Sequence, residues 1–316
     1  MEFKLVSSSS SKPLSSAVLV KIIAPKLQKL KWLLKLIVNP NFYDLINNSI
    51  FENSYNLDST LSTICYLALF ASQVLLYQPK IILYLKKLII LIKKKYNINI
   101  NLFNDINEKE NNKEQEFEKK EPIINEKILI ISQKLKLLSS YISDVRIFNR
   151  MWATLPLASW MFSTFQNIYQ KPSNQYSNFN KLLDFLQVTS CFLLQLFENI
   201  GFLGDHKFIN QLESKSLWYN IWCCKLWGFY VILDIIKNFE QLLKRKGGSR
   251  LLLLYNIDDD LNQKFISNIG DLPLTIHWSM EKGCLSPLAV GFFGTLSRGS
   301  KALNVWKNTF KEISKL

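Results

Sequence analysis

Five lysines between residues 80 and 94 are spaced so that they gather on one face of a helix. Lys80, Lys87 and Lys94 recur every seven residues, and two more lysines lie one step round the same side. Aliphatic side chains fill most of the opposite side, although Leu83 and Ile90 intrude among the lysines. Such a helix can pair its ammonium groups with lipid phosphates while its apolar face enters the acyl chains. The residues predicted to bind a membrane are Lys80, Ile82, Leu85, Lys86, Lys87, Ile89, Ile92, Lys93 and Lys94. The alternative is a core helix with a solvated lysine rim.

The residue types that serve catalysis are sparse. His206 and His277 are the only histidines, and no HExxH, GxSxG or GxxxxGK[ST] motif occurs. Asp258 to Asp260 lack the spacing of a calcium loop. We therefore expect no enzyme, no cofactor and no metal site, and we expect His277 to be a hydrogen-bonded, partly buried side chain. The cysteines form no CxxC pair and are expected to be small buried hydrophobes in a reducing compartment: Cys65, Cys191, Cys223, Cys224 and Cys284.

Composition favours a membrane as the anionic partner of the chain. Of 316 residues, 48% are hydrophobic and 20% charged, and the formal net charge is +14. The lysines alternate with Ile and Leu rather than with arginines and stacking aromatics, so nucleic acid is not the expected partner. Part of the abundant apolar surface is expected to face lipid.

The fold expected from these patterns is all-α, a membrane-associated helical bundle with amphipathic helices and a disordered polar insert. Residues 1–16 are Ser-rich and expected to be disordered, and 17–96 are expected to form basic amphipathic and membrane helices. Residues 97–127, rich in Asn, Lys and Glu, form the predicted disordered insert. Residues 128–313 are predicted to be a helical membrane domain that precedes the tripeptide 314–316.

Several elements can be placed more closely. The first basic amphipathic helix presents Leu27, Leu30, Leu34 and Ile37 on one side. Asp58 or Ser59 is expected to cap the next helix, whose uncharged run of roughly 20 residues is long enough to span a bilayer. A second uncharged run, from Arg150 to Lys171, is another candidate span, which Pro156 would kink.

The C-terminal part carries clear helix signals. Asp271 before Pro273 is expected to start a helix that Gly283 ends, and Ser286-Pro287 is expected to start the next one. Small residues then recur every three or four positions, which would let helix backbones approach closely. This predicted packing stripe consists of Gly291, Thr295, Gly299 and Ala302.

The sequence ends in Ser314, Lys315 and Leu316. A C-terminal S-K-L is an address read by the peroxisomal import receptor. The alternative is an accidental tripeptide on a basic helix.

Four segments resemble the peroxin-eleven family, the peroxisomal membrane proteins of organelle proliferation, and its gamma-type and fungal branch most. They are the C-terminal segment Gly270–Trp306, the D-x-x-L-x-x-x-x-Y helix Asp58–Tyr66, the paired-arginine segment Ser143–Trp152 and the segment Leu196–Asp205. In the last of these, Asn199 stands where the family usually has His.

The resemblance implies a helical protein of the peroxisomal membrane that elongates it, promotes division and controls peroxisome size and number. It implies anionic membrane lipids and self-association as contacts, with a dynamin-type fission machinery as a further partner. A metabolite pore is the alternative, because some family members are thought to form one. Four glutamines within the apolar runs could face the lumen of such a pore, so this alternative is retained: Gln73, Gln78, Gln187 and Gln195.

Overall fold

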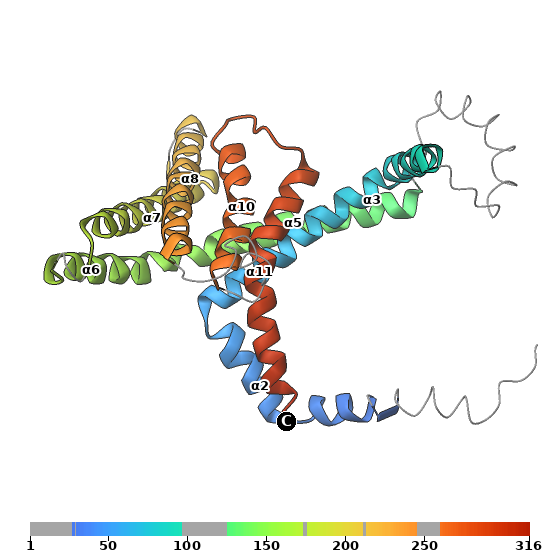
Figure 1. The fold of residues 1–316 in the computed structure, drawn as a ribbon, viewed down its shortest axis with the longest axis horizontal. Helices are drawn as coiled ribbons and strands as arrows, with labels where there is room; N and C mark the ends of the chain where they lie inside the picture. Colours follow the sequence, from blue (N-terminus) through green and yellow to red (C-terminus); the bar gives the residue numbers. More distant parts are fainter. Residues whose placement is uncertain (1–26, 29, 97–124, 173–175, 211–212, 245–259) are drawn as a thin grey trace, which may run out of the picture. The chain divides into compact units, whose positions relative to one another are not determined.

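The computed structural model of the chain describes residues 27–28, 30–96, 125–172, 176–210, 213–244 and 260–316, with the side chains of 80–96 left out (Figure 1). Within these ranges the regular structure is helical and contains no strand. The predicted all-α class is therefore confirmed. The predicted disordered segments, 1–16 and nearly all of 97–127, lie outside the described residues.

The helices form two compact units. One unit combines the chain up to residue 54 with residues 305–316, and its described part holds helix α2 (Pro40–Ile46), the π-helical turn η1 (Asn47–Phe51) and the end of helix α11 (Pro287–Ile313). Helix α2 begins at a proline because the side chain of Asn39 accepts a hydrogen bond from the backbone N of Asn41 at 3.1 Å. Leu36, Ile50 and Ile313 are buried in this unit.

The first basic amphipathic helix is helical where it is described, at residues 27–28 and 30–37. Its predicted apolar side is exposed along its described length, and these side chains are Leu27, Leu30, Leu34 and Ile37. Neighbouring Trp32 and Leu33 are exposed as well. The apolar side of this helix is therefore left uncovered by the described parts of the chain.

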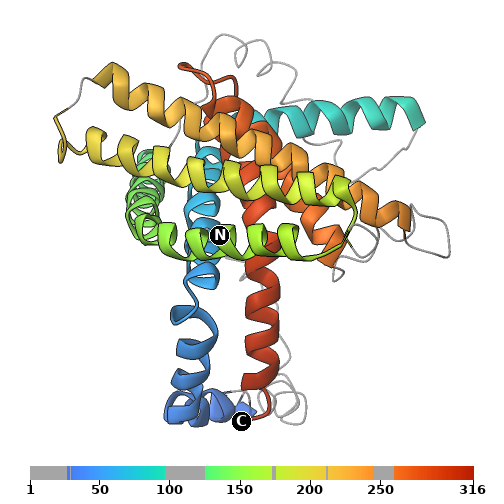
Figure 2. The ribbon, with the colours of Figure 1, turned by 90° about the vertical axis from the view of Figure 1, so that its left-hand side faces the viewer.

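The second unit, residues 55–304, holds most of the helices. They are α3 (Ser54–Tyr96), α5 (Glu126–Arg150), the 3-10 turn η3 (Met151–Ala153), α6 (Thr154–Gln170), α7 (Asn178–Asp205), α8 (Glu213–Lys244), α10 (Asp260–Trp278) and the first part of α11. Helix α8 packs against both α7 and α10, and α6 packs against α7. Figure 2 shows α6, α7 and α8 lying beside one another.

Helix α3 runs for 43 residues without a break, through Pro79 and along the whole lysine-rich segment. The backbone of 80–96 is thus helical, as the lysine spacing requires, whereas its side chains are outside the description. The predicted cap at Asp58 or Ser59 is wrong, because the helix already begins at Ser54. Asp58 therefore lies in the second turn, where its carboxylate is free for a tertiary contact.

The second uncharged run is divided between two helices. Helix α5 ends at Arg150, the turn η3 follows, and α6 begins at Thr154. Pro156 falls in the first turn of α6, where the N–H that proline lacks would have no partner within the helix, so it does not kink the helix. At the other end, α5 begins at Glu126, one residue before the predicted end of the insert, because Asn125 accepts from the backbone N of Lys127 at 2.9 Å.

The two C-terminal helices differ in how well their starts were predicted. Helix α11 begins at Pro287 as expected, with Ser286 Oγ accepting from the backbone N of Ala289 at 3.3 Å. The predicted start at Asp271 is wrong, because α10 runs from Asp260 to Trp278 with Pro273 inside it. Asp271 does not act as a helix cap, because its buried carboxylate is bonded to side chains of α11 in a tertiary contact.

In the part of the chain that the structure describes, three helices are long and apolar enough to cross a membrane: Ser54–Pro79 of α3, Asn178–Asp205 and Glu213–Lys244. The first corresponds to the uncharged run predicted from the sequence. The run between Arg150 and Lys171 is absent from this set, because α6 has only 17 residues, about 26 Å, against a hydrocarbon thickness of about 30 Å. Length and composition thus support a membrane-associated helical bundle.

Candidate functional site

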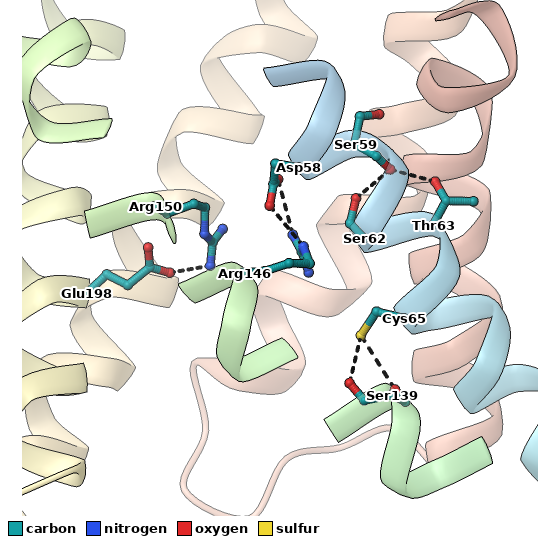
Figure 3. A network of polar contacts seen from close by, with 9 residues as sticks. All are labelled: Asp58, Ser59, Ser62, Thr63, Cys65, Ser139, Arg146, Arg150 and Glu198. Atoms are coloured by element: carbon teal, nitrogen blue, oxygen red, sulfur yellow. Dashed lines mark hydrogen bonds and ion pairs between the residues drawn. The ribbon is translucent and has the colours of Figure 1, made fainter. Parts of the chain in front are cut away.

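Two ion pairs join helices α3, α5 and α7 inside the second unit (Figure 3). Arg146 of α5 donates from Nε to Oδ1 of Asp58 at 2.9 Å and from Nη2 to Oδ2 at 3.3 Å, which is a bidentate pair. One turn later, Arg150 Nη2 donates to Oε1 of Glu198 at 2.5 Å. Arg146 is buried, so its pair with Asp58 is held largely away from water.

A third pair joins α10 to α11. Arg298 Nη2 lies 3.1 Å from Oδ1 of Asp271, and Ser297 Oγ donates to the same oxygen at 2.5 Å. Ser267 Oγ donates to Oδ2 of Asp271 at 3.3 Å. The buried carboxylate is therefore satisfied by one cation and two hydroxyl groups, which is what a charge removed from water needs.

Electrostatics unite the three pairs in one group, called here the charge cluster: Asp58, Arg146, Arg150, Glu198, Asp271 and Arg298. Burial by itself lowers the pKa of Arg150, but the carboxylates of Glu198 and Asp58 outweigh it and raise that pKa. The pKa of Arg298 is likewise raised, against the effect of burial, by Asp271 and also by Asp58. Both arginines are therefore fixed as cations, and three positive charges face three negative ones.

Small side chains bring α3 close to its neighbours around this cluster. Ser72 and Ser132 share a hydrogen bond of 3.0 Å, and Cys65 Sγ donates to the backbone O of Ser139 at 3.2 Å. All four residues are buried. Helix α5 thus lies against α3 through contacts that larger side chains would prevent.

Only part of the predicted packing stripe on α11 lies in a close helix contact. A Cβ on Gly291 would lie 2.7 Å from the backbone N of Phe70 on α3, so glycine is required for that approach. A Cβ on Gly299 would meet nothing within 4 Å in the described structure. Thr295 bonds within its own helix to Gly291 O at 2.7 Å, and Ala302 is buried. The sequence pattern missed Gly294, whose Cβ would lie 2.2 Å from the ring of Tyr66.

Two glutamines of the apolar runs, Gln187 and Gln195, and the nearby Asn199 lie in helix contacts. Gln187 is buried and accepts from Lys237 Nζ of α8 at 2.9 Å. Gln195, also buried, donates to Oδ1 of Asn199 at 2.8 Å. Asn199 in turn donates to Oγ1 of Thr154 at 2.9 Å, which ties α7 to α6.

The remaining predicted site residues lie outside the cluster. Ser314, Lys315 and Leu316 follow the end of α11 and are exposed, and Lys315 Nζ lies 2.6 Å from Oε1 of Glu312. The side chains of residues 80–94, which are predicted to bind the membrane, lie outside the described part of the structure. Among the described residues, no group of three or more His, Cys, Asp or Glu is arranged to hold a metal ion.

Of the cysteines, Cys65 and Cys223 are buried, as predicted for small hydrophobes. Cys191 and Cys224 are intermediate. Cys284 is exposed, so the prediction is wrong there, because the residue lies in the turn between α10 and α11.

His277 closes that turn and is hydrogen-bonded and half-buried, as predicted. Its Nδ1 accepts from the backbone N of Cys284 at 2.8 Å and of Leu285 at 2.9 Å. Gly283 has φ of +62°, and a Cβ there would strike the imidazole at 2.1 Å. Burial lowers the pKa of His277 below its ordinary value of 6.5.

This turn is expected to weaken in acid. Nδ1 must be unprotonated to accept two N–H groups, so the neutral imidazole is the form that the fold favours. Since the folded pKa is depressed, the contribution of His277 to stability is complete above about pH 6.5 and is lost as pH falls below it. Amide hydrogen exchange at Cys284 and Leu285, corrected for the intrinsic rate, should accelerate between pH 7.5 and 5.5. In His277→Gln the corrected rates should not depend on pH, and a wild-type rate that is equally flat would contradict the assignment.

Comparison with known proteins gives one partial match. No family model and no solved structure matches the chain. An uncharacterized protein of the fission yeast Schizosaccharomyces pombe is 32% identical over 104 residues, which are 32% of this chain and 47% of that protein. The chain thus spans about half the length of the curated relative that it matches.

Proposed function

We propose that this chain is a peroxisomal membrane protein that elongates the membrane, promotes peroxisome division and so controls peroxisome size and number. Its action is mechanical and not enzymatic. The lysine face of α3 acts as a wedge at headgroup depth, expanding one leaflet relative to the other and favouring curvature. Anionic lipids are its direct partners, with self-association and a dynamin-type fission machinery at later steps.

The observation that carries this proposal is the charge cluster. Each segment that resembles the peroxin-eleven family contributes a member. Asp58 belongs to the segment 58–66, Arg146 and Arg150 belong to the segment 143–152, and Glu198 belongs to the segment 196–205. Asp271 and Arg298 both belong to the C-terminal segment. Residues spread over more than two hundred positions of the sequence thus meet in one charge cluster. This shared contact gives a physical reason for the four motifs to occur in the same chain.

The apolar surface also supports a lipid partner. Three of the described helices are long and apolar enough to cross a membrane, and little of the apolar stretch of α8 is buried inside the structure. Polar side chains between these helices are bonded to one another, as in Lys237 with Asp184. Interhelical bonds of this kind satisfy polar groups that would otherwise face hydrocarbon.

The alternative function, a metabolite pore, requires polar side chains that face a lumen. Gln187 is instead buried and accepts from Lys237 of α8, and Gln195 is buried and bonded to Asn199 within α7. Two of the four glutamines that suggested a pore, Gln187 and Gln195, therefore have a packing role in a bundle, which favours the remodelling function; Gln78 is exposed.

The experiment is imaging of the tagged chain beside a peroxisomal marker. We expect the chain on the peroxisomal rim, loss of that position when Ser314–Leu316 is removed or the helical domain is truncated, and fewer, larger peroxisomes when the protein is deleted. Solute leakage measured in the same cells should be unchanged by the deletion. A cytosolic or nuclear signal would exclude the proposal, and altered permeability with normal peroxisome number would indicate the pore.

A further inference from the structure

Helix α6 presents a large apolar face without any charge. The twenty residues from Met151 to Gln170 contain no Asp, Glu, Lys or Arg. Large side chains along them are among the most exposed in the structure: Trp152 at 70%, Leu155 at 74%, Phe162 at 61% and Tyr169 at 92%. A continuous face of this kind marks a contact with a partner or with lipid rather than with water.

Three polar side chains of α6 are bonded to its own backbone. Thr154 Oγ1 donates to the O of Met151 at 3.0 Å, and Ser163 Oγ to the O of Trp160 at 2.9 Å. Asn167 Nδ2 donates to the O of Ser163 at 2.9 Å. A donor that is satisfied within the helix loses little when it leaves water, so these three groups can enter a low-dielectric medium at small cost. Exposed Ser159 and Gln166 are the polar side chains among the large apolar ones on this face.

A neighbouring side of α6 packs against α7. Phe165 stacks on Phe185 with ring centroids 5.5 Å apart, and Thr154 bonds to Asn199. Helix α7 is one of the three helices apolar enough to cross a membrane, and it exposes Phe179 and Leu182 itself. Helix α6 therefore packs against a helix that is itself suited to lipid.

We propose that the exposed face of α6 contacts the acyl chains of the bilayer, independently of lipid charge. This inference rests on the proposed membrane function and adds a second contact to the lysine wedge. Trp152 and Tyr169 flank the two ends of the helix, the positions that interfacial aromatic residues take. A protein partner is the weaker fit, because protein interfaces are enriched in arginine, which this segment lacks.

The test places a photoreactive benzoylphenylalanine in the full-length chain reconstituted in vesicles of phosphatidylcholine that carries a clickable acyl chain. Substitution at Phe162 should give lipid adducts after illumination. The matched control is Phe165, on the same helix but stacked on α7, where adducts should be lower by an order of magnitude. Labelling at Phe162 should persist in high salt, since screening weakens only ionic contacts.

Equal labelling at the two positions would overturn the inference, and so would adducts at Phe162 that contain a second polypeptide instead of lipid. Flotation of the same vesicles separates this failure from failure of the proposed function. A chain that floats but does not label at Phe162 contradicts the role of α6 alone. A chain that does not float after reconstitution contradicts membrane function altogether.

Discussion

Reversal of the lysine face, Lys80, Lys87 and Lys94 to Glu, is expected to abolish binding of a peptide of residues 79–95 to anionic vesicles. Each lysine near an anionic surface contributes about 1 kcal/mol, and reversal replaces this attraction with repulsion of similar size, so three reversals cost roughly 6 kcal/mol. That loss corresponds to a partition coefficient about ten-thousandfold lower. The measurement is vesicle co-sedimentation together with electron microscopy of vesicle shape, in which the native peptide should tubulate the vesicles.

The matched control replaces the same three lysines by arginine, which keeps the charge and should retain binding. Vesicles of neutral lipid should bind the native and reversed peptides alike and weakly. Vesicles that stay round at full coverage by the native peptide would contradict the wedge. Equal tubulation by the reversed peptide would show that charge sorting along this helix has no part in it.

Removal of Arg146 is the second large effect. In Arg146→Met the carboxylate of Asp58 loses both hydrogen bonds and its cation while remaining mostly buried. Breaking such a pair costs about 3 kcal/mol of unfolding free energy, the lower end of the usual range because Asp58 keeps some access to solvent. Thermal or denaturant unfolding in detergent measures it.

A double variant distinguishes the pair from general damage. Asp58→Asn combined with Arg146→Met removes the unpaired charge and should recover part of the loss, so the two substitutions should be non-additive. The control is Lys244→Ala, because Lys244 pairs with Glu240 on the surface and should contribute less than 1 kcal/mol. Strict additivity of the first two substitutions would mean that the ion pair does not hold α5 against α3.

Local signals predicted the fold well where they act within a few residues. Ser286-Pro287 starts α11 because a hydroxyl cap and a proline are both suited to the first turn. The heptad of lysines lies on a helical backbone. His277 is bonded and half-buried, since the glycine that follows leaves room for its ring.

The charge cluster could not be predicted, because its partners are far apart along the chain. Asp58 and Arg146 are 88 positions apart, and a carboxylate near a helix start is ordinarily interpreted as a cap. Asp271 is likewise expected from the sequence to start a helix. It lies instead within α10, which continues through Pro273, and its buried carboxylate accepts a hydrogen bond from Ser297. The resemblance pointed to these segments, but only the packed helices bring their charges together.

The central claim is that a lipid bilayer completes this fold, and whole-chain reconstitution tests it most directly. The purified chain, moved from detergent into vesicles of peroxisome-like anionic composition, should float with them and convert round vesicles into elongated ones. Both effects should grow with the protein-to-lipid ratio. A chain that is monodisperse in buffer without detergent, and that leaves vesicle shape unchanged at every ratio, would contradict the account.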